Sequence, residues 1–177
     1  MDVFQMLAVD ARVERRAAPG RRLESVPVGP GLYLEDLAVG QRFVSDSLEL
    51  DAEAIRDFAV RFDPQPFHLD DEAARATLFG GLAASGWHTA SLTMKLMVES
   101  DFRLAGGLVG AGIDELRWPR PTRPGDLISA EIEVIEINPS QSKPDRGMVR
   151  VLITTSNQAG QVVQSCIARI LVWRRPG

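Results

Sequence analysis

The chain has very few cysteines and histidines. It contains one cysteine, Cys166, and two histidines, His68 and His88, among 177 residues. An internal disulfide would need a second cysteine, and a zinc site built from Cys and His lacks ligands. A lone cysteine fits a reducing compartment, so we expect a cytoplasmic protein without a metal.

Net positive charge and long apolar runs are missing as well. The formal net charge is -4 and the isoelectric point is near 5.2, so no global positive field would attract nucleic acid or an acidic membrane surface. No apolar run approaches the roughly 18 to 20 residues that span a bilayer, and the first residues show no basic leader. We therefore expect neither a nucleic-acid partner nor a membrane partner.

The remaining composition is that of an ordinary globular domain. Hydrophobic residues make up 45% and charged residues 25%, close to the average of globular proteins. The length allows one domain with a proper core and is short for two. A Gly/Pro-rich stretch at residues 27–31 separates two parts. We predict a flexible or docking N-terminal arm at residues 1–31 and one domain at residues 32–177.

Helical patterns occupy the first half of the predicted domain. Asp51 is a good N-cap, and a helical face with i, i+3, i+4, i+7 spacing follows it: Ile55, Phe58, Ala59 and Phe62. This helix must end by residue 63, because Pro64 disfavours helical geometry in the residue before it. A short helix is expected around residues 70–77. Residues 87–98 are apolar on every side of a helix, which predicts a buried helix.

Strand patterns occupy the second half. Polar and apolar residues alternate in residues 108–118, 127–137, 148–157 and 161–173, and residues 157–160 predict a hairpin turn. A phase slip between Val134 and Ile135 indicates a bulge. One long buried helix and a run of successive strands predict an α+β fold, a single domain with an antiparallel sheet wrapped around the helix.

The stretch FDPQPFH at residues 62–68 places Asp63 and His68 around two prolines, where the first helix ends. Gly86 lies eighteen residues after His68, at the start of the predicted buried helix. The start of a helix presents unpaired N–H groups and the positive end of the helix dipole, which suit an oxyanion developing on a carbonyl. For an isolated Asp and His, a structural role is the commoner one; the spacing and Gly86 favour a functional role here.

Three stretches together resemble one known family: FAVRFDPQPFHLDDEAA, GGLAASGWHTASLTMKL and IDELRWPRPTRPGDLI. They are similar to the MaoC-type acyl dehydratases, the R-specific enoyl-CoA hydratase group of the hot-dog fold, over about residues 32–173. The resemblance implies that Asp63 and His68 hold and activate one water, and that the Gly86 N–H binds the thioester carbonyl. Gln65 stands where the family has asparagine. We predict substrate contacts from four neighbours of these residues: Gln65, Phe67, Ser85 and Trp87.

The activity implied by the resemblance is reversible hydration of a trans-2-enoyl-CoA in fatty acid metabolism, or the reverse dehydration. A homodimer or a higher homo-oligomer is implied, with CoA entering only as part of the substrate. Two alternatives stay open. A hot-dog thioesterase often carries an acidic residue on the central helix, and residues 87–98 contain none. A non-catalytic acyl-CoA binding module would keep the pocket without the chemistry.

Five further residues carry predictions about their surroundings. His88 is expected to be structural, and Cys166 to be a small buried thiol on an apolar strand face. Arg117, Arg120 and Arg123 form a basic cluster. That cluster either binds the phosphates of CoA or forms a solvated face.

Overall fold

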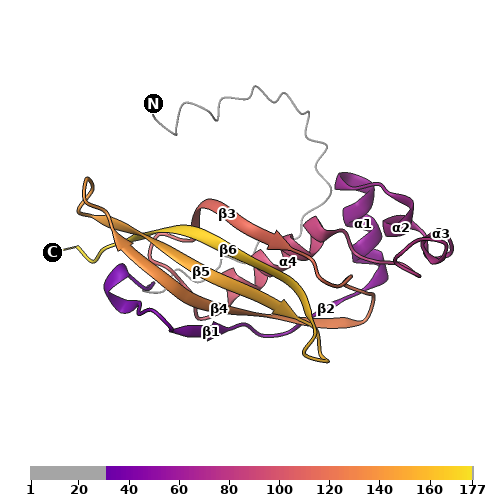
Figure 1. Ribbon diagram of the computed structural model, residues 1–177, viewed down its shortest axis with the longest axis horizontal. Helices are drawn as coiled ribbons and strands as arrows, with labels where there is room; N and C mark the ends of the chain where they lie inside the picture. The colour runs from indigo at the N-terminus through magenta and orange to yellow at the C-terminus, as the bar shows by residue number, and fades with distance from the viewer. Residues whose placement is uncertain (1–30, 177) are drawn as a thin grey trace, which may run out of the picture.

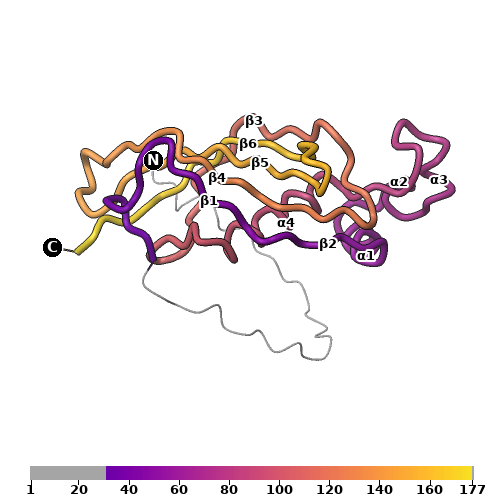
Figure 2. Tube along the Cα trace, turned by 90° about the horizontal axis from the view of Figure 1, so that it is seen from below, coloured from indigo at the N-terminus to yellow at the C-terminus, as the bar shows by residue number. Residues whose placement is uncertain are grey.

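The computed structural model describes residues 31–176, so the predicted arm lies outside the described residues and the division at residue 31 stays a prediction. The described part is an α+β unit built on one antiparallel sheet of six strands. No helix in it is both long and apolar enough to cross a membrane. Figures 1 and 2 show the sheet as one layer, with one long helix along a face of it and three shorter helices gathered at one end.

The last four of the six strands lie where the sequence pattern predicts strands. The six strands are β1 (Arg42–Val44), β2 (Leu48–Leu50), β3 (Val109–Arg117), β4 (Asp126–Pro139), β5 (Arg146–Ser156) and β6 (Val162–Trp173). The order in the sheet is β1-β4-β5-β6-β3, and β2 also pairs with β4. The predicted bulge is confirmed, because the register between β4 and β5 shifts between Val134 and Glu136. The hairpin predicted at residues 157–160 joins β5 to β6.

The helices are α1 (Ala52–Phe62), α2 (Pro66–Leu69), α3 (Asp71–Arg75) and α4 (Gly86–Glu99), and a 3-10 turn covers Leu34–Asp36. The predicted cap of α1 is confirmed, since Asp51 Oδ1 accepts the Ala54 N–H at 2.7 Å. Helix α2 was not predicted from the sequence. It forms because proline at the first helical position has a suitable φ and needs no N–H partner there.

The main core lies between α4 and the sheet. Its members are mostly inward-facing strand residues, among them Ile132, Val134, Val149, Val151, Ile170 and Val172, with Met97 of α4 and Phe102. Cys166 is buried in the same cluster, as predicted. Burying these apolar side chains supplies the main driving force that holds the helix on the sheet.

Two expectations about helix burial were wrong. Phe62 is 70% exposed, because only the earlier turns of α1 reach the core through Ile55 and Ala59, while Phe62 contacts Phe58 of its own helix. Helix α4 is not buried on every side: Trp87 is 60% exposed and Met94 46% exposed. One side of α4 packs on the sheet and α1 contacts it through Phe58 and His88, while Trp87 and Met94 are left exposed.

Candidate active site

Asp63 is held at the point where α1 ends. Its N–H still donates to the Ala59 carbonyl at 2.9 Å, and its φ of -154° takes the chain out of the helix before Pro64. The carboxylate accepts two side-chain hydrogen bonds, from Gln65 Nε2 to Oδ1 at 2.7 Å and from Ser85 Oγ to Oδ2 at 2.6 Å. The helix end therefore fixes the backbone, and two donors fix the orientation of the carboxylate.

His68 lies on the short helix α2 and is only 4% exposed. Its Nδ1 lies 2.7 Å from the Ala83 carbonyl oxygen. Because a carbonyl oxygen can only accept, Nδ1 carries the proton, and in neutral imidazole Nε2 then has a free lone pair. The backbone contact thus selects the tautomer whose Nε2 can act as a base.

Nε2 of His68 and Oδ2 of Asp63 face each other across 3.4 Å. Both atoms bear lone pairs when the histidine is neutral, so a favourable contact needs a shared proton or a water that donates to both atoms from one side. Burial raises the pKa of the Asp63 carboxyl, but the hydrogen bonds from Ser85 and Gln65 and the charge of His68 outweigh burial and lower it overall. Asp63 is therefore ionised near neutral pH.

The start of α4 adjoins this pair. Ser85 is the N-cap of α4: its Oγ accepts the Trp87 N–H at 3.2 Å while donating to Asp63. The Gly86 N–H makes no hydrogen bond to any residue within 31–176. A free N–H at the first position of a fourteen-residue helix, beside an ionised carboxylate and a basic imidazole, can stabilise an oxyanion.

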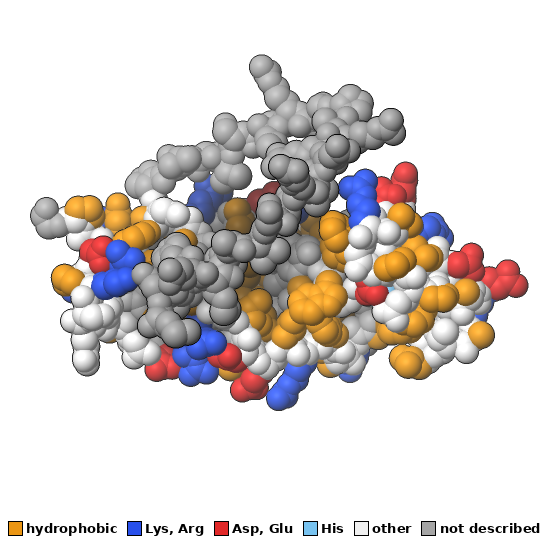
Figure 3. Space-filling model, turned by 90° about the horizontal axis from the view of Figure 1, so that it is seen from above, with side chains coloured by type: hydrophobic (Ala, Val, Ile, Leu, Met, Phe, Trp, Pro, Cys, Tyr) orange, Lys and Arg blue, Asp and Glu red, His pale blue; other side chains and the backbone are white. Residues whose placement is uncertain are grey.

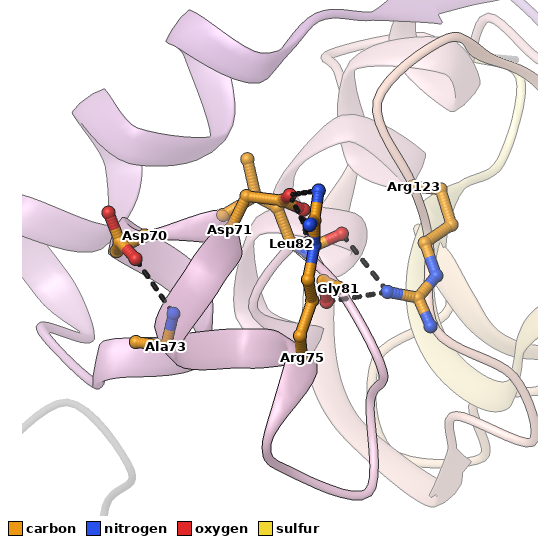
Figure 4. Close-up of polar contacts among 7 residues, drawn as sticks. All are labelled: Asp70, Asp71, Ala73, Arg75, Gly81, Leu82 and Arg123. Atoms are coloured by element: carbon orange, nitrogen blue, oxygen red, sulfur yellow. Dashed lines mark hydrogen bonds and ion pairs between the residues drawn. The ribbon is translucent and has the colours of Figure 1, made fainter.

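The loop between α3 and α4 is held by charged side chains on both sides (Figure 4). Arg123 donates to the carbonyls of Gly81 and Leu82, at 2.6 and 3.1 Å, and to that of Phe79. Asp71 accepts the Leu82 N–H at 2.9 Å and pairs with Arg75 at 2.8 Å. The next carbonyl along the chain, that of Ala83, is the partner of His68, so this clamp fixes the acceptor that selects the tautomer.

A cavity of about 470 Å³ adjoins the candidate site, although Asp63 is not among the residues that line it. His68, Gly86 and Thr89 lie in its wall, and Trp118 covers one side. Thr89 and Thr122 share a hydrogen bond between their Oγ1 atoms at 3.0 Å, and the Thr122 carbonyl accepts the Ala84 N–H at 2.9 Å. The cavity therefore combines an apolar aromatic wall with few, fixed polar groups, as small-molecule sites usually do.

The structure brings most of the predicted site residues together, and their roles stay predictions. Gln65 and Phe67 line the cavity with His68 and Gly86. Gln65 also reaches the Asp63 carboxylate, which gives the longer amide a local function. Ser85 is 1% exposed and uses its hydroxyl internally. Trp87 points elsewhere, into a second cavity between α4 and the strands β3 and β6.

Some site features had no clear signal in the sequence. Trp118 and Thr122 line the cavity from a segment far along the chain, and neither was singled out. Arg123 was assigned to a basic cluster, whereas its guanidinium is occupied by backbone carbonyls. Arg117 pairs with Glu115 at 3.4 Å, and Arg120 lines the cavity. Within the described residues, no group of three His, Cys, Asp or Glu side chains could hold a metal ion.

Comparison with known proteins identifies the family. The model of the MaoC like domain matches residues 36–157, which is more than half of the chain. The chain therefore belongs to the MaoC-like family, and its sheet and central helix form the hot-dog fold that the sequence predicted.

Individual relatives agree with this assignment. The crystal structure of a MaoC-like dehydratase from Rhodospirillum rubrum is 58% identical, with a TM-score of 0.81, and the match covers 83% of this chain and all of that one. The R-hydratase PhaJ1 from Pseudomonas aeruginosa is 27% identical, with a TM-score of 0.66 over 82% of this chain and 88% of that one. A 3-hydroxybutyryl-CoA dehydratase from Methylorubrum extorquens is 31% identical over 113 residues, 63% of this chain and 69% of the relative.

Proposed function

We propose that the protein is a hydro-lyase that reversibly adds water to a trans-2-enoyl-CoA to give a 3-hydroxyacyl-CoA. The observation that carries the proposal is the pairing of His68 Nε2 with Asp63 Oδ2, next to the free N–H of Gly86. Named hydratases and dehydratases among the relatives support the reaction class. CoA would enter only as part of the substrate.

The chemistry of hydration matches the three groups. In the proposed mechanism, a water held beside the pair, within reach of both atoms, donates one proton to His68 Nε2 as its oxygen bonds to C3 of the enoyl group. The ionised Asp63 carboxylate holds the water and stabilises the imidazolium that forms. Negative charge moves to the thioester oxygen, where the Gly86 N–H stabilises it. His68 then returns the proton to C2, which completes the addition of water and restores the enzyme.

The experiment is a panel of enoyl-CoA esters of several chain lengths, straight and branched, followed by the loss of the conjugated absorbance. Free thiol is measured in parallel. We expect loss of absorbance without thiol release, abolished in Asp63→Asn and in His68→Ala. Release of thiol would indicate a thioesterase instead, and binding without either signal a non-catalytic module. The thioesterase alternative lacks its usual acidic residue near the site, because Glu99, the one acidic residue of α4, pairs with Lys95 at the far end of the helix.

We further propose that the protein acts as a homodimer joined along β3. This strand is the edge of the sheet, and it exposes Val109 and Ile113 beside the exposed Trp87 and Met94 of α4. Figure 3 shows hydrophobic side chains on this side of the molecule. An exposed apolar edge strand is a ready surface for pairing with another chain. Light scattering after size-exclusion chromatography measures the mass, and a monomer at micromolar concentration would contradict the proposal.

A further inference from the structure

Two cavities lie on neighbouring faces of the first turns of α4. The candidate active site touches Gly86 and Thr89, while the second cavity, of about 300 Å³, touches Trp87, Ala90 and Met94. The second cavity is almost wholly apolar, and its volume is at the lower end for ligand pockets. It contains no residue of the Asp63 and His68 pair.

Trp118 occupies the boundary between these cavities. Its indole lies against Gly86 so closely that a Cβ at position 86 would be 2.7 Å from the ring atoms Cδ2 and Cε2. The Nε1 edge of the same ring donates to Gln164 Oε1 at 2.8 Å, and Gln164 lines the second cavity. The indole therefore extends from the proposed oxyanion donor to the wall of the apolar cavity.

Gln164 holds the Trp118 indole through this hydrogen bond. It is 2% exposed and sits among apolar residues, where an amide without a hydrogen-bond partner is costly. Trp118 is the partner of its Oε1. Trp87 adds an edge-to-face contact, with ring centroids 5.5 Å apart. Two contacts from different elements thus fix one orientation of the indole.

The strand before Trp118 is bent at the same place. The register between β3 and β6 shifts between Asp114 and Arg117, and Glu115 has a φ of 54°, which non-glycine residues seldom adopt. Bulges of this kind change the direction in which the following side chains point. The irregular end of β3 therefore contributes to the position of Trp118.

From these contacts we infer that Trp118, held by Gln164, limits the length of the acyl group that the site accepts; the inference rests on the proposed function. With the indole against Gly86, a short acyl group fits the active-site cavity alone. A longer chain must displace the indole and break its hydrogen bond before it can enter the apolar cavity. Trp118 is thus a specificity-determining residue, and the second cavity is the space that its displacement opens.

The experiment compares kcat/KM for trans-2-octenoyl-CoA with kcat/KM for crotonyl-CoA in wild type, Trp118→Ala, Trp118→Phe and Gln164→Leu. Each methylene buried is worth about a fourfold gain in binding, and octenoyl has four more than crotonyl. We expect Trp118→Ala to raise the octenoyl-to-crotonyl ratio by about tenfold or more, since chain ordering offsets part of that gain. Trp118→Phe and Gln164→Leu should change the ratio in the same direction by less.

Trp173→Phe is the matched control, because it alters an indole that lies outside both cavities. Its ratio should equal that of wild type. An unchanged ratio in Trp118→Ala overturns the inference. If Trp118→Ala fails to fold, an unchanged octenoyl-to-crotonyl ratio in both Trp118→Phe and Gln164→Leu overturns the inference instead.

Calorimetric binding of butyryl-CoA and octanoyl-CoA, which cannot be hydrated, separates this inference from the proposed function. If no enoyl-CoA is hydrated but Trp118→Ala binds octanoyl-CoA more tightly relative to butyryl-CoA, the hydratase proposal fails and the role of Trp118 stands. If crotonyl-CoA is hydrated and neither ratio responds to the variants, the role of Trp118 fails and the hydratase proposal stands.

Discussion

The two histidines of this chain are both buried, yet their surroundings differ in kind. His68 has a carbonyl at one ring nitrogen and a carboxylate facing the other. His88, on α4, stacks on Phe58 with ring centroids 4.5 Å apart and planes within 4°, and its Nδ1 has no hydrogen-bond partner among residues 31–176. Burial lowers the pKa of His88, and the nearby charge of Asp51 only partly offsets that effect.

The contrast shows what distinguishes the surroundings of the histidine proposed to react from those of a packing histidine. Around His68 the protein provides a carbonyl acceptor that selects the tautomer and a carboxylate that faces Nε2. Around His88 it provides an aromatic face, and Nδ1 has no hydrogen-bond partner in residues 31–176, so the ring serves as a flat packing element. His68 and His88 are thus buried to a similar degree, but only His68 faces a carbonyl and a carboxylate at its two ring nitrogens.

The largest effect is expected from exchanging each histidine for glutamine. His68→Gln should lower kcat for crotonyl-CoA by about a thousandfold, because a general base is lost. His88→Gln should keep kcat close to the wild-type value while lowering the midpoint of thermal unfolding. Steady-state kinetics and a thermal melt check both variants. If His88→Gln loses as much activity as His68→Gln, the contrast between the two sites is wrong.

A second effect is expected from releasing the carbonyl that faces His68. Arg123→Ala removes the clamp on the loop before Ala83, and small displacements of catalytic groups can lower kcat by about a hundredfold. Guanidinium ion at millimolar concentration should restore part of the kcat in Arg123→Ala. Arg117→Ala, which removes an exposed arginine, should behave as wild type with or without guanidinium. Loss of kcat without any rescue would point to a general folding defect.

The third effect concerns the pKa of Asp63, the carboxylate that faces His68. The Gln65 amide is one of the hydrogen bonds that lower the pKa of Asp63, so Gln65→Met should raise that pKa. An NMR titration that follows the Asp63 carboxyl carbon should therefore show its midpoint at higher pH in Gln65→Met than in wild type. Gln65→Asn keeps an amide and should move the midpoint less. A midpoint that stays in place, or moves to lower pH, contradicts the role given to Gln65.

The smallest effect concerns stability around His88. Its pKa is lower in the folded state than the unfolded value of about 6.5, so the unfolded chain binds more protons below that pH. Stability should therefore fall as pH drops below about 6.5, by at most about 1.4 kcal/mol per pH unit from this group. Urea unfolding between pH 5 and 8 measures the slope. His88→Leu should flatten it, whereas Phe58→Leu should lower stability at every pH and keep the slope.

The sequence predicted the architecture well because periodicity and caps are local signals. Asp51, the bulge after Val134 and the hairpin before β6 all appeared where the pattern placed them. The spacing of Asp63, His68 and Gly86 located the site. Trp118 and Arg123 were beyond sequence reasoning, since their roles depend on contacts with residues more than thirty positions away. The exposed side of α4 was missed because an all-apolar helix does not show which face lacks a neighbour.

The hydroxyl of Ser85 links the start of α4 to the orientation of the Asp63 carboxylate. The same oxygen caps α4 and donates to Asp63, so fraying of the first helical turn and reorientation of the carboxylate are a single event. The reactive state is therefore available only to molecules whose central helix is intact at its first residue. On gentle heating, the proposed hydratase activity should decline before the helical circular-dichroism signal does, so its loss would mark melting of the first turn of α4.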